Sequence, residues 1–439
     1  MAGVDRLFGT DGVRGRANTD LTVDIALNLA RAAGESMEGP VVIGRDTRRS
    51  GPMFTTALHA GFSSVGVDTI DVGILPVGGV SRLIRQLEAP LGVMVSASHN
   101  PAHDNGIKFL GPTGGKLKDE QETVIETRYR RGAPWKHPDG ALIGMRSNML
   151  DAVDRYVENL TANTDYGLRG LEFVMDTANG AAFKAAPQLF EALGATVEVH
   201  AAEPDGMNIN AGCGATQPEY LAGLVNGRPG LAFDGDADRL IAVDEEGVVA
   251  NGDVLMAIFA KQLKEQGKLR NNTVVTTVLA NLGFRRAMER LGVDVVETAV
   301  GDRYVYEAMR EAKAALGGEQ SGHIIFYRGT TGDGLRTAVR LAEVMAATGK
   351  PLVELRKVIT EYPQVLRNIT VADKAKLDGS ADVWNAVADA ERHLGDDGRI
   401  LVRASGTEPL VRVMVEAATA DMAERIADSV GAVVAESLG

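Results

Sequence analysis

Residues 171–199 read LEFVMDTANGAAFKAAPQLFEALGATVEV. An apolar run over 171–175 is followed by a polar turn, by a stretch of helical character that ends at Leu193, and by a second apolar run that begins at Gly194. Strand, turn, helix, glycine and strand in this order are typical of a βαβ unit, because glycine readily takes the left-handed conformation that ends a helix. The segment therefore predicts two parallel strands joined by a helix.

The same pattern occurs twice more, over residues 40–72 and 273–297. Three copies at comparable spacing predict a triplicated α/β unit. The residues from about Asn368 onward have a different spacing and predict a smaller fourth domain. We therefore expect an α/β protein with three related α/β domains, mixed sheets and a smaller C-terminal α+β domain around one central cleft. The expected domain boundaries are 1–160, 161–250, 251–366 and 367–439.

Composition narrows the class of protein. The 439 residues carry a formal net charge of −13 with no basic tract, which argues against nucleic-acid or anionic-membrane partners. The single cysteine, Cys213, leaves no intrachain disulfide to form. The N-terminus lacks an apolar signal segment, and no stretch of eighteen apolar residues occurs. A cytoplasmic protein is expected. The sequence does not give the oligomeric state, and a homodimer is one option that it leaves open.

The segment Asp234-Gly-Asp-Ala-Asp-Arg239 directly follows the apolar run 230–233. On extended backbone its three carboxylates point to one side, where they repel unless a divalent cation lies between them. A solvated acidic loop is the alternative for such a pattern taken alone. An EF-hand is disfavoured because Arg239 stands where that loop needs glycine. Mg²⁺, which takes a few carboxylates and completes its shell with phosphate oxygens, is the preferred ion, and it indicates phosphoryl chemistry.

Two further apolar runs end in polar loops, 96–101 and 317–323. Ligands of α/β sheets gather at the carboxyl ends of strands, so the three loops are expected to face one site. Ser98 is a candidate nucleophile or phosphate carrier, and a hydrogen-bonded turn is the alternative. A phosphoserine carries roughly −1.5 to −2 charge, so the aspartates could bind it only through a cation.

Lys108 and two histidines are further candidates. Lys108 would act as a general acid or base if neighbouring cations lower its pKa, and otherwise it is an ordinary surface lysine. His99 and His103 have a spacing that suggests zinc, but Pro101 interrupts the helix that this spacing requires.

Residues 403–409 (RASGTEP), together with Arg412, have the features of an anion site. A glycine permits close backbone approach, two hydroxyl side chains donate, and arginine grips a phosphate through parallel bonds. The glycine-rich segment 8–15 (FGTDGVRG) lacks the Lys-Ser/Thr of a P-loop and is expected to present Arg14 instead. Residues 318–323 (GEQSGH) suit sugar hydroxyls or a tight turn.

The serine loop, the aspartate loop, the GEQSGH segment and the RASGTEP segment, in this order, resemble the α-D-phosphohexomutase superfamily over essentially the whole chain. Within it the chain is most similar to the phosphoglucosamine mutase branch. The segments that carry this likeness are 8–15, 208–214, 300–305, 362–365 and 412–416. Ala404 departs from the proline of many members, which should loosen its loop slightly.

The resemblance implies an enzyme that interconverts glucosamine 6-phosphate and glucosamine 1-phosphate, feeding UDP-N-acetylglucosamine and cell-wall precursor synthesis. Phosphoryl would pass from phosphorylated Ser98 to the free hydroxyl of a phosphohexosamine. The resulting bisphosphate would turn around and return its other phosphate to Ser98. One Mg²⁺ per chain is implied, and a sugar bisphosphate or a kinase would first phosphorylate Ser98.

The resemblance also implies roles for individual residues. The metal would be held by the phosphate on Ser98 with Asp234, Asp236 and Asp238. The residues expected around the chemistry are Ser98, His99, Lys108, Arg14, Arg239 and His323, with the arginines neutralising charge and Lys108 or His323 transferring protons. Glu319 and Ser321 would hold sugar hydroxyls. The phosphate that is not reacting would be gripped by Arg403, Ser405, Gly406, Thr407 and Arg412.

Three other interpretations stay open. A phosphomannomutase/phosphoglucomutase would use the same mechanism on a different sugar. An Asp-dependent phosphohydrolase would use Asp234 as the nucleophile, transfer phosphoryl to water and not need Ser98. A non-catalytic sugar-phosphate binding protein is the third.

Overall fold

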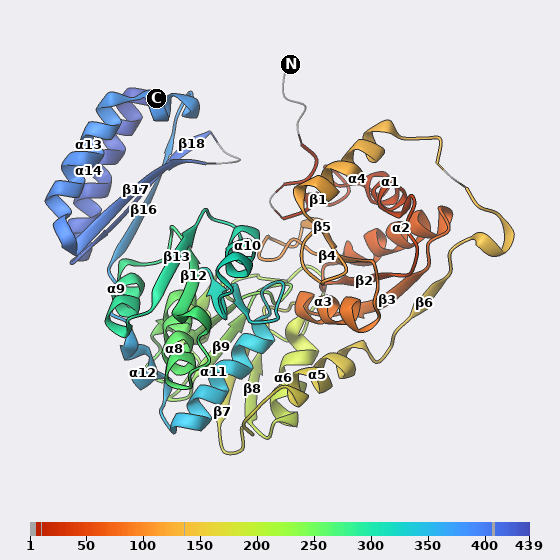
Figure 1. Ribbon diagram of the computed structural model, residues 1–439, viewed down its shortest axis with the longest axis horizontal. Helices are drawn as coiled ribbons and strands as arrows, with labels where there is room; N and C mark the ends of the chain where they lie inside the picture. The colour runs from red at the N-terminus through yellow and green to blue at the C-terminus, as the bar shows by residue number, and fades with distance from the viewer. Residues whose placement is uncertain (1–5, 10, 136, 406–408) are drawn as a thin grey trace. The chain divides into compact units, whose positions relative to one another are not determined.

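The structure is a computed structural model that describes residues 6–9, 11–135, 137–405 and 409–439. The chain divides into two compact units, and each is described by itself. One unit runs to Val278 and includes Asp294–Lys357, and the other comprises Leu279–Val293 and Val358–Gly439. Four sheets are present among the described residues, three in the first unit and one in the second (Figure 1).

The first sheet has six strands in the order β1-β5-β4-β2-β3-β6. Its strands are β1 (Val13–Arg16), β2 (Val41–Arg45), β3 (Thr69–Ile74), β4 (Leu91–Val95), β5 (Asp104–Leu110) and β6 (Arg146–Asn148). Its helices are α1 (Val23–Gly34), α2 (Gly51–Ser64), α3 (Val77–Gln86) and α4 (Asp119–Arg131), with a 3₁₀ turn at Gly140–Leu142. β2 pairs in parallel with β3 and β4, whereas β5 is antiparallel to β4, so the sheet is mixed.

The alternation of side chains along β2 places a helix layer on each face. Val41 and Ile43 pack into the core formed with α1 and α2. Gly44 points the other way, and a Cβ there would lie 2.5 Å from the side chain of Val80 in α3.

The second and third sheets repeat the parallel core. The second has the order β11-β10-β9-β7-β8 and the third the order β13-β12-β14-β15. The second comprises β7 (Glu172–Asp176), β8 (Thr196–His200), β9 (Gly230–Phe233), β10 (Leu240–Val243) and β11 (Val249–Ala250), with α5 (Ala152–Ala162), α6 (Ala182–Ala192) and α7 (Pro218–Ala222). The third comprises β12 (Thr273–Thr277), β13 (Asp294–Thr298), β14 (Leu316–Gly318) and β15 (Ile324–Phe326), with α8 (Gly252–Glu265), α9 (Leu282–Leu291), α10 (Asp302–Ala312), α11 (Gly334–Thr348), α12 (Leu352–Leu355) and 3₁₀ turns at Arg270–Asn272 and Arg356–Val358.

The C-terminal sheet is fully antiparallel in the order β16-β18-β17. Its elements are β16 (Gln364–Thr370), β17 (Gly398–Ala404), β18 (Leu410–Ala417), α13 (Ala381–Leu394) and α14 (Ala420–Leu438), with 3₁₀ turns at Lys374–Gly379 and Gly395–Asp397. Figure 1 shows α13 and α14 side by side against this sheet. Helix α9 connects β12 to β13 along the chain but belongs to the C-terminal unit, where the buried carboxylate of Glu416 accepts from the backbone N–H of Leu282 at 2.8 Å.

The three predicted repeats are confirmed. Each yields two parallel strands joined by a helix: β2-α2-β3, β7-α6-β8 and β12-α9-β13. The glycine after each helix has positive φ, at +87° for Gly66, +91° for Gly194 and +59° for Gly292. The α/β fold class with three related domains and a smaller C-terminal domain is likewise confirmed. Within the described residues, no helix combines the length and the apolar character needed to cross a membrane.

Candidate active site

Ser98 lies just beyond the carboxyl end of β4 and is buried. Its backbone is left-handed, with φ of +51°, which is uncommon for a residue with a Cβ. Its Oγ donates to Oδ2 of Asp234 at 2.5 Å, and its N–H donates to Ser96 Oγ at 2.9 Å. Its carbonyl accepts from Arg48 and Asn210, both at 2.9 Å. Asp234 therefore holds the hydroxyl, and the other three contacts hold the backbone of Ser98.

Arg48 organises this loop, and sequence reasoning missed it. The guanidinium is fully buried, donates to Asp46 Oδ2 at 2.9 Å, and donates to backbone carbonyls of the serine loop, among them Asn100 at 2.7 Å. Burial raises the pKa of Asp46, and Arg48 and the Ser96 hydroxyl act against that rise. The available signal was a polar Asp-Thr-Arg triplet directly after β2, in the position that the motif loops occupy after other strands.

The aspartate loop follows β9 and brings three buried carboxylates together. One oxygen each from Asp234, Asp236 and Asp238 can be chosen so that all lie within 4.8 Å of one another. Burial and the two neighbouring carboxylates raise the pKa of Asp234 well above its ordinary value. Oδ1 of Asp236 and Oδ1 of Asp238 are buried without a hydrogen-bond partner. Buried, unpaired carboxylate oxygens are costly, and a divalent cation satisfies them, so this cluster fits Mg²⁺.

Gly235 lets the two loops touch. A Cβ at this position would lie 2.4 Å from the carbonyl oxygen of Ser98, closer than any real side chain. Glycine at position 235 is therefore required for the approach of the aspartate loop to the serine loop.

Lys108 on β5 is buried against the carboxylates and is not a surface lysine. Its Nζ lies 2.7 Å from Asp236, 3.1 Å from Asp11 and 4.0 Å from Asp238. Burial would raise the pKa of Asp238, but His323, Lys108 and Arg239 lower it well below its ordinary value.

His323 and Arg239 join the aspartate loop to the third predicted loop through an isolated backbone bridge. Nδ1 of His323 lies 3.5 Å from Asp238, and Nε2 accepts from the N–H of Gly332 at 2.8 Å. The ring proton therefore sits on Nδ1. Burial lowers the pKa of His323, but Asp238 and other carboxylates outweigh it and raise that pKa. The Gly332 bond favours the neutral ring and so opposes this rise.

Arg14, His99 and Arg239 also lie near the triad. Arg14 donates to Asp11 and, at 3.4 Å, to Asn100, and burial lowers its pKa. Burial also lowers the pKa of Arg239, but the aspartates outweigh it and raise that pKa above its ordinary value. Burial and then the two arginines lower the pKa of His99 to about 4, so its ring is neutral at pH 7. Its Nδ1 lies 3.5 Å from Ser98 Oγ.

Asp11, Lys116 and Asp302 extend the charged network and were also missed. Lys116 pairs with Asp11 and lies 2.9 Å from Asp302, whose other oxygen lies 3.5 Å from His323 Nε2. Together with His323, Asp238 and Lys108 they close a ring in which carboxylates alternate with nitrogen-bearing side chains. Asp302 stands in the Val-Gly-Asp-Arg segment already singled out, but a pattern in one segment does not show which distant lysine it meets.

Glu319 and Ser321 follow β14 in the third loop. Glu319 accepts from the N–H of Gly301 at 3.1 Å and from Ser321 Oγ at 3.5 Å. Both side chains are partly exposed, which leaves polar groups available to a ligand.

The predicted phosphate loop lies in the second unit. Arg403 on β17 and Arg412 on β18 are directly opposite each other in the antiparallel pair. Burial and the charge of Arg412 lower the pKa of Arg403. Ser405 is buried, and its carbonyl accepts from Lys374 at 2.6 Å. Gly406 and Thr407 lie outside the described residues.

Comparison with family models covers nearly the whole chain. The models match the phosphoglucomutase/phosphomannomutase alpha/beta/alpha domains I (residues 5–134), II (154–247) and III (251–362) and the C-terminal domain (366–432).

Sequence relatives and solved structures agree with this assignment. A phosphoglucosamine mutase of Rhodococcus erythropolis is 51% identical over 440 residues, covering 98% of this chain and 99% of the relative. One of Streptomyces griseus subsp. griseus is 48% identical over 450 residues, covering 99% and 100%. A phosphoglucomutase/phosphomannomutase family protein from Burkholderia thailandensis superposes with a TM-score of 0.81 at 25% identity, covering 99% and 98%. The chain belongs to the phosphoglucomutase/phosphomannomutase family and, within it, to the phosphoglucosamine mutases.

Proposed function

We propose that the chain interconverts glucosamine 6-phosphate and glucosamine 1-phosphate by way of a phosphoserine at Ser98 and a bisphosphate intermediate. The carrying observation is that the Ser98 hydroxyl donates to Asp234 at 2.5 Å inside a cluster of three buried aspartates. A hydroxyl surrounded by carboxylates is poorly placed to act as a nucleophile without a cation, because the negative charges oppose its deprotonation. It is a suitable carrier for a phosphoryl group whose charge a cation neutralises. The product would feed the synthesis of UDP-N-acetylglucosamine and cell-wall precursors.

Asp234, Asp236, Asp238 and the phosphate on Ser98 would hold one Mg²⁺. When bound, this ion supplies positive charge that offsets the negative charge of the transferring phosphoryl group. Arg239 and Arg14 lie close enough to interact electrostatically with the aspartates and would add to that charge, because a guanidinium keeps its proton at neutral pH.

The transfer conserves atoms and charge. The bond from phosphorus to Ser98 Oγ breaks while a bond forms from phosphorus to a free sugar hydroxyl, whose proton goes to a neighbouring base. In the second half the other phosphate of the bisphosphate returns to Ser98, and the released sugar oxygen takes a proton back. Lys108 and His323 are the candidate proton carriers, since both lie buried within 4.0 Å of Asp238.

The remaining groups are proposed to position the sugar. Glu319 and Ser321 would hold hydroxyls. Arg403, Ser405 and Arg412, with Gly406 and Thr407, would grip the phosphate that is not reacting, whichever end of the sugar carries it. We also propose domain boundaries at 1–160, 161–250, 251–366 and 367–439. Because the bisphosphate must turn without escaping, the C-terminal domain of this proposal would move during the cycle. A cytoplasmic location and a homodimer stay predictions.

The test compares wild type, Ser98→Ala and the control Ser147→Ala by peptide mass and by turnover of glucosamine 6-phosphate in Mg²⁺. We expect phosphate on the Ser98 peptide, activity lost by several orders of magnitude in Ser98→Ala, and activity retained in the control. Isomerase activity that survives in Ser98→Ala would sink the phosphoserine mechanism.

Two companion measurements separate the alternatives. Release of inorganic phosphate would move the assignment to a hydrolase centred on Asp234. Faster turnover of mannose or glucose phosphates on a sugar panel would move it to a phosphomannomutase/phosphoglucomutase.

A further inference from the structure

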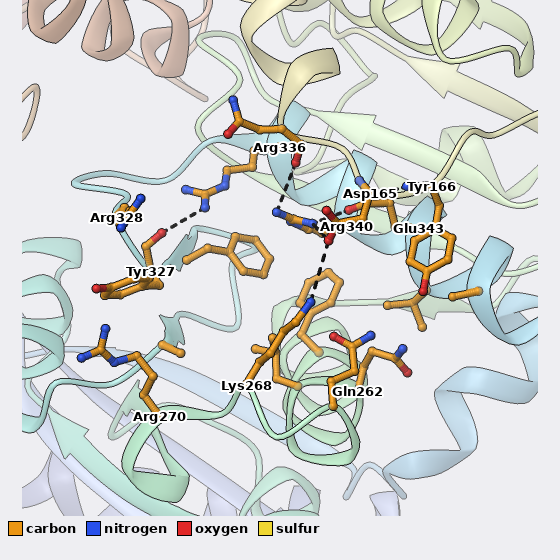
Figure 2. A pocket seen from close by; sticks show the side chains of 18 of the residues that line it. Asp165, Tyr166, Gln262, Lys268, Arg270, Tyr327, Arg328, Arg336, Arg340 and Glu343 are labelled. Carbon is orange, nitrogen blue, oxygen red and sulfur yellow. Dashed lines mark hydrogen bonds and ion pairs between the residues drawn. The ribbon is translucent and has the colours of Figure 1, made fainter.

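A cavity of about 510 Å³ lies in the first unit, and none of the residues lining it belongs to the candidate active site (Figure 2). Its apolar wall comes from α8, β15 and α11, through Phe259, Leu263, Phe326 and Val344. The volume falls within the range of small-molecule sites. We call it the larger cavity.

A second cavity of about 200 Å³ adjoins it, which we call the smaller cavity. The residues that line both are Asn163, Tyr327, Arg328, Arg336 and Arg340. The smaller cavity adds Arg82 and Arg85 from α3. Five arginines therefore line the smaller cavity, which adjoins the apolar wall of the larger cavity.

Four of these five arginines lack a matching carboxylate among the described residues. Arg340 is the exception, at 2.6 Å from Glu343 and 3.9 Å from Asp165. Across the described ranges, none of the other four has a carboxylate oxygen within ion-pair distance. Arg85 donates to the carbonyl of Arg328 at 3.1 Å, and Arg336 donates to the carbonyl of Tyr327 at 3.0 Å. Nε of Arg82 is buried without a hydrogen-bond partner.

The cluster stores unfavourable repulsion. Burial, and then the charges of Arg82, Arg340 and Arg85, lower the pKa of Arg336 to about 10 against the opposing effect of Asp333. The side chain is still charged at pH 7, so positive charges are held together in a chain whose net charge is −13. An anion with several charges would relieve the repulsion and satisfy the free N–H groups.

The larger cavity suits a flat ring next to that anion. The ring of Tyr327 is 46% exposed, and the guanidinium of Arg270 stacks on it at 4.3 Å. Figure 2 shows Tyr327 between Arg270 and Arg328 at the rim of the cavity. Aromatic and guanidinium planes are the groups on which planar heterocycles stack.

We propose that the two adjoining cavities form a nucleoside diphosphate site, with the diphosphate among the arginines of the smaller cavity and the base against the apolar wall and Tyr327. A sugar monophosphate would use only part of this surface. The site is separate from the chemistry at Ser98, and its existence does not depend on which sugar the enzyme isomerises.

The test measures binding of ADP and UDP to the full-length protein by calorimetry, with pyrophosphate and adenosine as half-ligands. We expect at least one nucleotide to bind more tightly than pyrophosphate, and adenosine to bind weakly or not at all. Arg85→Gln and Arg328→Gln should each weaken nucleotide binding about tenfold or more, because each removes a charge-assisted contact.

Controls separate this site from the catalytic one. Arg155→Gln, which changes a partly exposed arginine on α5 outside both cavities, should bind nucleotide like wild type. Arg403→Gln should also retain nucleotide binding. Unchanged glucosamine 6-phosphate turnover in Arg85→Gln and Arg328→Gln would show that both variants are folded.

Three results would overturn the proposal. They are no nucleotide binding at millimolar concentration, equal affinity for pyrophosphate and nucleotides, or binding that is lost in Arg403→Gln and kept in Arg85→Gln and Arg328→Gln.

Discussion

Ser98 shows how a single residue is prepared for its role. Its left-handed backbone costs energy, and such strain persists only where the surroundings impose it. Here the surroundings are the buried Asp46–Arg48 pair, the Ser96 hydroxyl and Asn210, all of which bond to the serine loop. The hydroxyl is thus held in place without a ligand, and in the proposed phosphoryl transfer this would lower the entropic part of the barrier.

Lys108→Met tests whether this buried lysine of the candidate active site transfers protons. Loss of the ammonium removes a candidate proton carrier and a positive charge 2.7 Å from Asp236. We expect turnover to fall by about 10²–10⁴-fold, while Mg²⁺ affinity stays equal or rises because a competing cation is gone. Steady-state kinetics over a Mg²⁺ titration measures both. Turnover within a few-fold of wild type would exclude Lys108 from proton transfer.

At the scale of elements, the same strand-turn-helix-strand unit delivers three of the site's loops. In each domain the strand that returns beside the first one, β4, β9 or β14, is parallel to it and leads to a functional loop. The serine, the aspartates and the Glu319–His323 segment therefore occupy equivalent places in three repeats, at the carboxyl ends of strands.

Asp71, which joins three elements of the first sheet, gives a prediction about how the stability of the fold depends on pH. This residue of β3 contacts His59 of α2 at 3.4 Å and Arg146 of β6 at 2.6 Å. Burial would raise the pKa of Asp71, but the nearby His59 ring, the hydrogen bond from the Gly73 N–H and the charge of Arg146 lower it to about 2. A depressed folded-state pKa gives stability that is complete above the unfolded-state pKa near 4 and is lost as pH falls toward 2.

Asp71→Asn should therefore lower stability by about 1 kcal/mol at pH 7, a value reduced for solvent screening. The gap in thermal midpoint between variant and wild type should narrow from pH 7 to pH 3. Asp421→Asn, in an exposed pair with Arg425, serves as the control and should show little gap at either pH. A gap for Asp71→Asn that is the same at pH 7 and pH 3 would contradict this assignment.

At the scale of the whole molecule, a bound cation should stabilise the first unit. The folded loop holds one oxygen of each aspartate within 4.8 Å of the others, so Mg²⁺ should bind the native state more tightly than the unfolded chain and shift unfolding by mass action. We expect saturating Mg²⁺ to raise the thermal midpoint, relative to chelator, by on the order of 5 °C. Asp236→Asn and Asp238→Asn should lose the rise, and the exposed Asp428→Asn should keep it. An equal rise in all variants would place the ion elsewhere.

Local pattern was sufficient for much of the fold and for part of the site. The repeats, their terminal glycines and the position of each functional loop follow from apolar periodicity and from glycine's access to left-handed backbone. The aspartate loop was recognisable because three like charges at alternate positions need a cation. These are properties of neighbouring residues, which a sequence displays directly.

Other features depend on residues far apart in the chain. Lys116 and Asp302 are 186 positions apart, and Arg48 reaches Ser98 from the loop after β2, the neighbour of β4 in the sheet. The five arginines of the smaller cavity come from segments around 82 and 336 that show no common pattern.

Hydrophobic periodicity, turn chemistry and charge density act between near neighbours, so the repeats, the loop that holds Ser98 and the acidic cluster could be predicted from the sequence. The burial of Lys108, the carboxylates that it contacts and the arginine-lined smaller cavity could be seen only in the tertiary structure. Burial and long-range pairing arise only when separate sheets pack against one another.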